Sequence, residues 1–291
     1  MDPHLLRTFV TVVRRRSFSA AAEELGYTQS AISQQIAALE ADLGLPLLRR
    51  RPVAPTRAGE RLLEHARPLL LRHRAARADV LRAAAGPAGR LTVAASPLAL
   101  IPAVVRALEP GGPAVTLRTA GRDRVAEEVA SGDADLGFAD GIAAPSDPLR
   151  LAGTGAPTGV GIAEEELVVV LPARHPLARR RGLELAGLAD ALWLHAPAFV
   201  PVERLREVAG GGAFRTGFRY DGHDLRTVLS LVAAGHGLAL LPASAPAGAD
   251  AGAGALTAVP LTAPRLVHRV EMLCDPLASG EVRAVAGRLG A

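Results

Sequence analysis

Lysine is absent from this chain of 291 residues, so all 33 basic side chains are arginine. A phosphate-binding P-loop requires a lysine, and a pyridoxal phosphate enzyme requires one for its Schiff base. Both classes of enzyme are therefore excluded. The uniform use of arginine is typical of a GC-rich genome and indicates no function by itself.

Cysteine is almost as scarce, because Cys274 is the only one. A single thiol cannot form an internal disulfide, a tetrahedral thiolate metal site or a two-cysteine redox switch. The N-terminus lacks a signal-peptide pattern, since its apolar residues are interleaved with Arg7 and Arg14 to Arg16. The uncharged stretch from Leu91 to Val105 is too short to span a membrane and contains two prolines. We expect a soluble protein of the reducing cytoplasm, with no membrane partner.

Aromatic residues make up only 3% of the chain, against 49% for all hydrophobic residues. The length allows two or three domains with proper cores, built mostly from leucine, valine and alanine. The charge is unevenly distributed. Residues 1–90 carry 15 arginines and 8 acidic residues, a net charge of +7, whereas residues 91–291 carry 18 and 21, a net charge of −3. This asymmetry predicts that only the first 90 residues meet a polyanion.

The stretch from Ser17 to Leu43 predicts two short helices joined by a tight corner. The first spans Ala20 to Leu25, Gly26 and Tyr27 form the corner, and Thr28 is placed to cap the second helix. In the second helix one apolar stripe follows helical spacing: Ile32, Ile36, Leu39 and Leu43. The opposite face is small, polar and uncharged: Ser30, Ser33, Gln34 and Ala37. Such a face suits close approach to base edges in a DNA major groove, although an ordinary surface helix is the alternative.

A basic hairpin is predicted directly after this helix. An apolar helix from His4 to Arg15 would pack beneath the two-helix unit, and the prolines and glycine after Leu43 end the second helix. The expected turn, or wing, carries three adjacent arginines that could contact phosphates, or that form only a solvated turn. The candidate DNA-binding residues are Thr28, Gln29, Ser30, Ser33, Gln34, Arg49, Arg50, Arg51 and Thr56.

A long helix is predicted from Thr56 to about Ala85, with apolar residues at three- and four-residue steps. It has little of its own domain to pack on, so pairing with the same helix of a second copy would bury the stripe. Pro68 should kink this helix or split it in two. Gly86, Pro87 and Gly89 then predict a linker.

From Arg90 onward strands and helices alternate, which predicts a parallel sheet with covering helices. The expected strands are Leu91–Ala95, Val115–Thr119, Ala134–Asp140, Glu166–Leu171, Leu192–His195, Phe214–Tyr220, Gly237–Leu241 and Leu266–Leu273. The expected helices are Pro97–Leu108, Arg122–Ser131, Leu185–Ala191, Val202–Val208, Leu225–Ala234 and Gly280–Leu289. Residues 141–163 and 243–256 are interpreted as an irregular connection and a loop. This is enough material for two sheets, and hence for two lobes with a cleft between them.

Ligands of such α/β folds bind at the carboxyl ends of strands. The candidate effector-binding residues are Ser96, Pro97, Leu98, Thr119, Asp140, His195, Asp221 and His223. Ser96 and Pro97 would open a helix whose free N–H groups favour an anion, or Ser96 is a plain helix cap. His195 and His223 could equally be ordinary surface or core histidines. The loop Asp221-Gly222-His223-Asp224 is not expected to bind a metal, because such polar loops are common.

Taken together, these motifs resemble those of the LysR-type transcriptional regulators. Over residues 5–59 the match consists of S-F-x-x-A-A-x-x-L at Ser17–Leu25, T-Q-[PS]-A-[VI]-S-x-Q-I at Thr28–Ile36, then Leu39-Glu40, Leu43-Gly44 and T-x-A-G at Thr56–Gly59. Looser matches are H-P-L-A at His175–Ala178 and the glycine-rich segment Gly235–Pro242. Two departures make this wing and helix unusual: Ser30 stands where the family usually has proline, and Leu48-Arg49 replaces the common Phe-Glu.

The resemblance implies a multidomain α/β protein. It would have a winged helix-turn-helix DNA-binding domain (1–58), a dimerising linker helix (59–88) and a two-lobed effector domain (89–291) similar to periplasmic binding proteins. Lobe I would comprise 89–163 and 266–291, and lobe II 164–265. The resemblance further implies binding to promoter DNA as a homodimer or homotetramer, with RNA polymerase as a further candidate partner and no cofactor. An enzyme is the first alternative, but the sequence has no Gly-x-Ser-x-Gly, glycine-rich fingerprint or His-Glu-x-x-His motif. A solute-binding module is the second, opposed by the basic N-terminal region.

Overall fold

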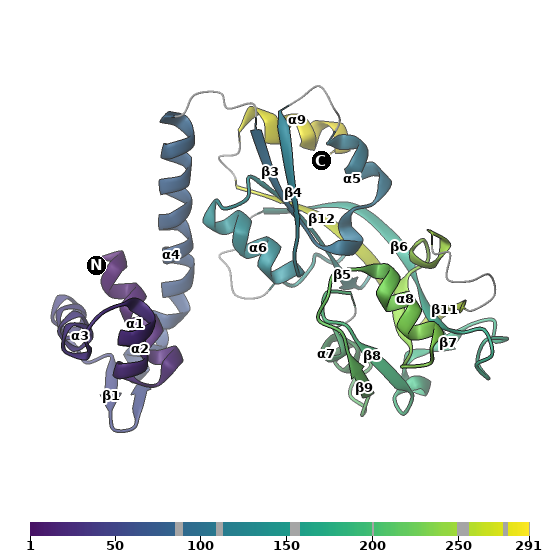
Figure 1. Ribbon diagram of the computed structural model, residues 1–291, viewed down its shortest axis with the longest axis horizontal. Helices are drawn as coiled ribbons and strands as arrows, with labels where there is room; N and C mark the ends of the chain where they lie inside the picture. Colours follow the sequence, from purple (N-terminus) through teal and green to yellow (C-terminus); the bar gives the residue numbers. More distant parts are fainter. Residues whose placement is uncertain are drawn as a thin grey trace. The chain divides into compact units, whose positions relative to one another are not determined.

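The computed structural model describes residues 1–84, 90–108, 113–151, 158–199, 201–248, 256–275 and 279–290 (Figure 1). These residues form two compact units that divide near residue 86, and each has its own hydrophobic core. The linker expected at Gly86, Pro87 and Gly89 lies outside the described residues. Among the described residues, no helix is both long enough and apolar enough to cross a membrane.

The N-terminal unit packs three helices around one core, next to a hairpin and a long helix. Its elements are α1 (Pro3–Arg15), α2 (Phe18–Leu25), α3 (Gln29–Leu43), β1 (Leu48–Arg50), β2 (Val53–Pro55) and α4 (Arg57–Ala84). Ile32, Ile36 and Leu39 are buried, which confirms most of the predicted stripe. Leu43, the last residue of the predicted stripe, is 39% exposed and does not share this burial. The helix ends at this residue, because Gly44 takes the left-handed conformation and turns the chain away.

The β1–β2 hairpin is fixed to its neighbours by two close contacts. Glu40 Oε1 accepts hydrogen bonds from the backbone N–H groups of Leu47 (2.8 Å) and Leu48 (3.1 Å), so the end of α3 holds the start of β1. A Cβ on Gly59 would lie 2.2 Å from the carbonyl oxygen of Leu47, so only glycine lets α4 approach this closely. The hairpin, α3 and α4 therefore keep one relative position.

Helix α4 runs without interruption through Pro68 over 28 residues. Pro68 was predicted to kink this helix or to split it in two, and the split is wrong. Proline removes one backbone hydrogen bond, but residues on both sides of it pack on the same core: Leu63 and Ala66 before it, and Leu70 after it. This shared packing keeps both halves of the helix on one core.

The C-terminal unit is built on an eight-stranded mixed sheet with the order β4-β3-β5-β12-β6-β11-β7, in which β10 also pairs with β6. Strands β3, β4 and β5 are parallel, and β12 is antiparallel to both of its neighbours. The strands are β3 (Arg90–Ala95), β4 (Ala114–Thr119), β5 (Leu136–Ala143), β6 (Thr158–Pro172), β7 (Leu183–Glu184), β10 (Ala239–Pro242), β11 (Leu256–Ala263) and β12 (Val267–Cys274). Strands β8 (Leu192–His195) and β9 (Arg215–Arg219) form a separate parallel pair.

Strand β6 belongs to both halves of this sheet. Residues from Thr158 to Glu166 pair with β12, and those from Leu167 to Pro172 pair with β10 and β11. The expectation of two separate sheets is therefore corrected to one shared sheet plus the β8–β9 pair. The interpretation of residues 141–163 as an irregular connection is wrong at both ends, since β5 continues to Ala143 and β6 begins at Thr158. Strand β11, which starts within the expected loop 243–256, was not predicted.

Helices cover the faces of the sheet, and prolines shorten the first of them. The predicted helix Pro97–Leu108 is instead the 3₁₀ turn η1 (Pro97–Ala99) followed by α5 (Pro102–Ala107), because Pro102 lacks an N–H and disfavours helical backbone at Ile101. The expected helix Leu185–Ala191 is the 3₁₀ turn η2 (Leu185–Leu188). The remaining elements are α6 (Arg122–Ser131), α7 (Val202–Val208), α8 (Leu225–Ala233), η3 (Ala245–Gly248) and α9 (Gly280–Leu289).

Candidate functional site

Helix α3 presents the polar face predicted for it. The Thr28 hydroxyl accepts the backbone N–H of Ala31 at 3.2 Å, which confirms the predicted cap. The hydroxyl of Ser30 lies 3.0 Å from that of Thr28. Gln29, Ser30 and Gln34 are exposed and Ser33 is half-buried, so an uncharged surface extends along the first two turns of the helix.

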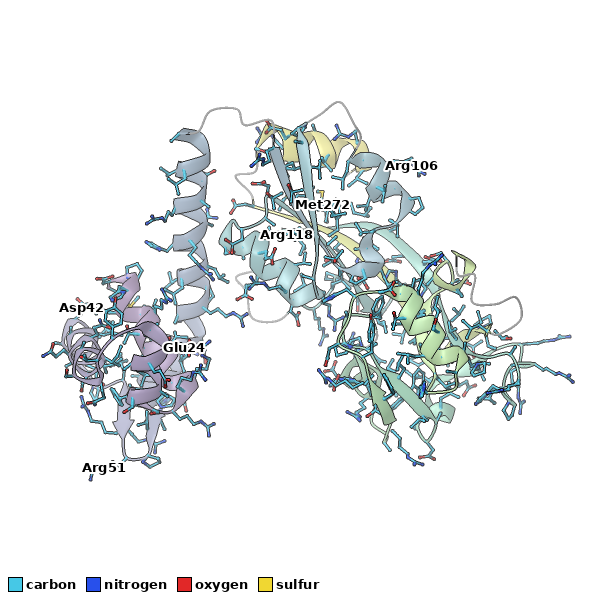
Figure 2. All side chains as sticks on the ribbon, in the orientation of Figure 1. Glu24, Asp42, Arg51, Arg106, Arg118 and Met272 are labelled. Atoms are coloured by element: carbon cyan, nitrogen blue, oxygen red, sulfur yellow. The ribbon has the colours of Figure 1, made fainter. Side chains whose placement is uncertain are left out.

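The hairpin brings its arginines beside this surface. All three of Arg49, Arg50 and Arg51 are exposed, and Arg51 lies at the tip (Figure 2). Arg50 Nη1 donates a hydrogen bond to Ser33 Oγ at 3.3 Å, and its guanidinium carbon lies 5.7 Å from the centre of the Phe18 ring. Such a cation–π contact adds a modest attraction at an exposed site. Arg50 therefore ties the hairpin to α3 and to the start of α2.

Thr56 has a structural role in the same region. Its hydroxyl donates to the carbonyl oxygen of Pro46 at 2.8 Å and accepts the N–H of Gly59 at 3.1 Å. The hydroxyl therefore acts both as a donor and as an acceptor, and it caps the start of α4. Thr56 was predicted to contact a phosphate, and the structure adds this capping duty.

In the C-terminal unit, the residues predicted at strand ends fall into two groups, and the first lies where β3 ends beside the middle of β5. The Ser96 hydroxyl accepts the N–H of Asp140 at 2.8 Å and donates to the carbonyl oxygen of Phe138 at 3.4 Å. Pro97 and Leu98 are the first two residues of the three-residue turn η1, and Leu98 packs in the same cluster as Phe199. The prediction that Ser96 opens a helix suited to an anion is wrong, because that turn has no helical length and the Ser96 hydroxyl is already bonded.

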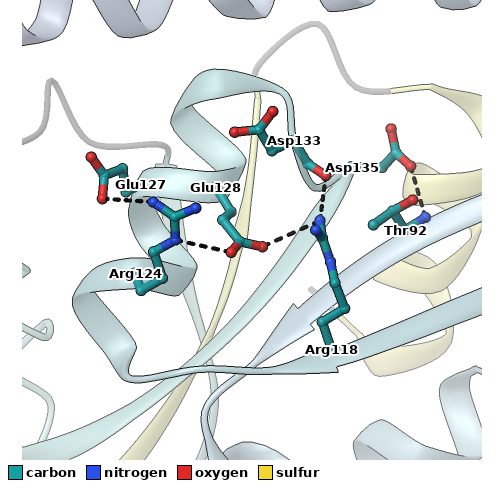
Figure 3. Close-up of polar contacts among 7 residues, drawn as sticks. All are labelled: Thr92, Arg118, Arg124, Glu127, Glu128, Asp133 and Asp135. Atoms are coloured by element: carbon teal, nitrogen blue, oxygen red, sulfur yellow. Dashed lines mark hydrogen bonds and ion pairs between the residues drawn. The ribbon is translucent and has the colours of Figure 1, made fainter. Parts of the chain in front are cut away.

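Thr119 ends β4, the strand beside β3, and is exposed. The residue before it anchors this edge strand: Arg118 Nη2 donates to the carbonyl oxygen of Asp133 at 2.5 Å and pairs with Glu128 at 3.2 Å (Figure 3). Arg124 reaches the other oxygen of Glu128 at 3.1 Å. Burial lowers the pKa of Arg124, but its hydrogen bond with Glu128 and the attraction of that carboxylate outweigh burial and raise the pKa overall.

The second group lies at the ends of β8 and β9. Arg219 Nη1 lies 2.7 Å from His195 Nε2, and the same guanidinium binds both oxygens of Asp221 at 2.7 and 3.0 Å. The hydrogen bond from Arg219 holds the pKa of Asp221 below its usual range. A groove of about 330 Å³ runs beside His195 and Arg219. His223 is exposed.

The loop after β9 shows no metal-binding geometry. Asp224 accepts the N–H groups of Arg226 and Thr227 and caps α8, and the hydroxyl of Thr227 lowers its pKa. Within the described ranges, no group of three histidine, cysteine, aspartate or glutamate side chains is placed to hold a metal ion.

Two residues of these groups, His268 and Arg219, were not predicted from the sequence. His268 Nε2 lies 3.1 Å from Asp140 Oδ2, and both side chains are buried. Arg219 bridges His195 and Asp221. His268 interrupts the apolar alternation of β12, which was a usable signal, whereas Arg219 lies on an exposed strand and gave none.

The N-terminal unit places an uncharged helix face beside a basic hairpin, which is the arrangement of a winged helix-turn-helix DNA-binding domain. The α/β unit that follows carries polar groups at its strand ends, as ligand-binding domains do. Two family models match the chain: a bacterial regulatory helix-turn-helix protein of the lysR family over residues 3–60, and a LysR substrate binding domain over residues 84–289. The chain belongs to the LysR family. It is a transcriptional regulator with a helix-turn-helix DNA-binding domain and an effector-binding domain.

Relatives and solved structures of similar length support this. A probable hydrogen peroxide-inducible genes activator from Mycobacterium avium is 32% identical, covering 98% of this chain and 92% of the relative. The transcriptional regulator BudR of Raoultella terrigena is 33% identical, with 84% and 85% covered. The crystal structure of CbnR, a LysR family transcriptional regulator, shares the fold with a TM-score of 0.56 at 23% identity, covering 100% and 98%. These relatives are named as regulators rather than enzymes.

Proposed function

We propose that this regulator reads DNA with the exposed face of α3 and holds the phosphates beside it with the hairpin. Gln29, Ser30 and Gln34 offer short side chains that donate and accept hydrogen bonds, which suits base edges. Within the described chain no hydrogen bond engages Arg49 or Arg51, so their guanidinium groups can contact phosphates. The observation that carries the proposal is the bond from Arg50 to Ser33, which keeps these arginines beside the reading face.

We further propose the domain boundaries 1–58, 59–88 and 89–291, with lobe I (89–163 and 266–291) and lobe II (164–265) meeting along β6. Residue exposure along α4 supports its role in forming a homodimer or homotetramer. Leu69, Val80 and Leu81 are 47%, 68% and 59% exposed on this helix, and large apolar surfaces of this kind favour pairing. We also propose a cytoplasmic location, because a regulator that binds promoter DNA acts where that DNA lies.

The proposed effector is a small molecule bound at the strand ends of the two lobes. The supporting observation is that Asp140 lies buried within β5 just beyond the end of β3, and that His195 lies buried at the end of β8. Thr119 is exposed at the end of β4. An effector with different affinity for two arrangements of the lobes would shift the regulator between its active and inactive states.

The DNA assignment is tested by gel shift at fixed salt, with an operator selected from random duplexes. Arg51→Ala should weaken binding to all duplexes about equally, and Gln34→Ala should reduce discrimination between the operator and point variants of it. Arg180→Ala, an exposed arginine of the C-terminal unit, is the matched control and should change nothing. Unchanged affinity in the double variant Gln34→Ala and Arg51→Ala would contradict the assignment.

A further inference from the structure

Asp140 lies buried within β5, just beyond the point where the neighbouring strand β3 ends, and one oxygen of its carboxylate is unpaired among the described residues. The residue is only 4% exposed. Its Oδ2 lies 3.1 Å from His268 Nε2, while its Oδ1 has no hydrogen-bond partner among the described residues. A buried oxygen without a donor is costly, so a carboxylate kept in this state invites a donor from a bound molecule.

The strand register determines which charges share this face of the sheet. His268 on β12 lies directly opposite Glu165 on β6, and residues opposite each other in antiparallel strands point to the same face. Glu165 accepts hydrogen bonds from the backbone N–H and the hydroxyl of Ser244 at 2.5 and 2.9 Å. The face around Asp140 therefore holds two carboxylates and one imidazole.

The arginines near this face are directed elsewhere. Arg269 follows His268 and so points to the opposite face, where it pairs with Glu164 at 2.5 Å and Glu271 at 2.7 Å. Arg204 reaches β5 only through the carbonyl oxygen of Ile142 at 3.4 Å, and its other end pairs with Glu207. Neither guanidinium neutralises Asp140.

We propose that Asp140 is a specificity-determining residue of the effector site, and that the effector presents a positively charged nitrogen donor, such as a protonated amine or amidine, to its Oδ1. The proposal rests on the proposed effector site at the strand ends. Its physical basis is that a carboxylate accepts strong charge-assisted hydrogen bonds from cationic donors, whereas a second carboxylate beside it would be repelled. Anionic groups are rejected from this end of the site.

The test measures the affinity of the full-length protein for three probes that share a ring and differ in charge: benzylamine, benzyl alcohol and benzoate. Calorimetric titration of the wild type should give the tightest binding for benzylamine. The isosteric variant Asp140→Asn should lower the affinity for benzylamine by about tenfold, which is the usual effect of losing one charge-assisted hydrogen bond. The same variant should raise the affinity for benzoate. Glu164→Gln, the matched acid on the opposite face, should leave the order of the three probes unchanged.

Three results would overturn the proposal, and they have different meanings. If benzoate binds the wild type more tightly than benzylamine does, and Thr119→Ala lowers the affinity for benzoate, the strand-end site stands and the charge assignment fails. If Asp140→Asn lowers the melting temperature but keeps the order of the probes, Asp140 only clamps β5 to β12. If no probe responds to Asp140→Asn, Thr119→Ala or His195→Ala, the proposed effector site itself fails. The wild-type ranking and the Thr119 variant still decide the question should Asp140→Asn not fold.

Discussion

Arg50 differs from its two neighbours because the protein already holds its guanidinium against Ser33 and Phe18. A phosphate contact releases counterions, so each one adds about 0.9 to the slope of log affinity against log salt concentration. Arg49→Ala and Arg51→Ala should each reduce the magnitude of this slope by about 0.9. Arg50→Ala should leave the slope unchanged but reduce sequence discrimination, because it frees the hairpin and Ser33.

Ser33→Ala serves as the control for Arg50→Ala, because the two side chains share one hydrogen bond. An arginine only donates, so Ser33 Oγ accepts from it and keeps its own proton to donate to an acceptor on a base edge in the proposed complex. Ser33→Ala and Arg50→Ala should therefore lose discrimination at the same base pair, and the double variant should lose no more. A slope that falls in Arg50→Ala as it does in Arg51→Ala would assign Arg50 to a phosphate instead.

Cys274 gives a second prediction at this scale. Burial raises the pKa of its thiol, and the nearby charge of Asp275 adds to the effect. A raised pKa means less thiolate at neutral pH, and the thiolate is the reactive form. Iodoacetamide should therefore alkylate Cys274 more slowly than a free cysteine at pH 7, with a rate that rises as the pH increases. Hydrogen peroxide should change operator binding equally in the wild type and in Cys274→Ser. A peroxide response that disappears in Cys274→Ser would make this thiol a sensor.

Among the elements, α4 has the clearest consequence for assembly. Val80 and Leu81 are both more than half exposed near its C-terminal end, and burying them against a second copy would remove apolar area from water. Replacing both with arginine should convert the oligomer to a monomer by light scattering at micromolar concentration and weaken operator binding. The double methionine variant keeps the apolar surface and should remain oligomeric. A wild-type protein that is monomeric under these conditions would remove the proposed role of α4.

The helices and strands also show which parts of the fold could be predicted from the sequence. Helices α1 to α3 follow from apolar spacing and from local caps such as Thr28, which act within one turn. Strand β11 and the start of β6 were missed because pairing in a sheet depends on distant partners, and because these segments contain alanine, glycine and proline, which are depleted in strands. In the site, Ser96 could be placed directly after its strand, whereas Asp140, predicted at a strand end, lies within β5 because that strand continues to Ala143. The pairing of Asp140 with His268 could not be predicted, because it depends on the register of β12 against β5.

For the molecule as a whole, the two units have separate cores, so their stabilities should be separable. Ile36 is buried in the core of the N-terminal unit, and Leu205 is buried in the core around β6 and α7. Truncating such a side chain to alanine typically costs about 2–5 kcal/mol. In differential scanning calorimetry, Ile36→Ala should lower one unfolding transition and Leu205→Ala another, because a chain with independent cores need not unfold in one step. If each variant shifts one common transition, the units unfold as a single cooperative body. The distinction bears on regulation, because independent units can transmit an effector signal only by changing how they are arranged, whereas a single cooperative body could also transmit it through shared stability.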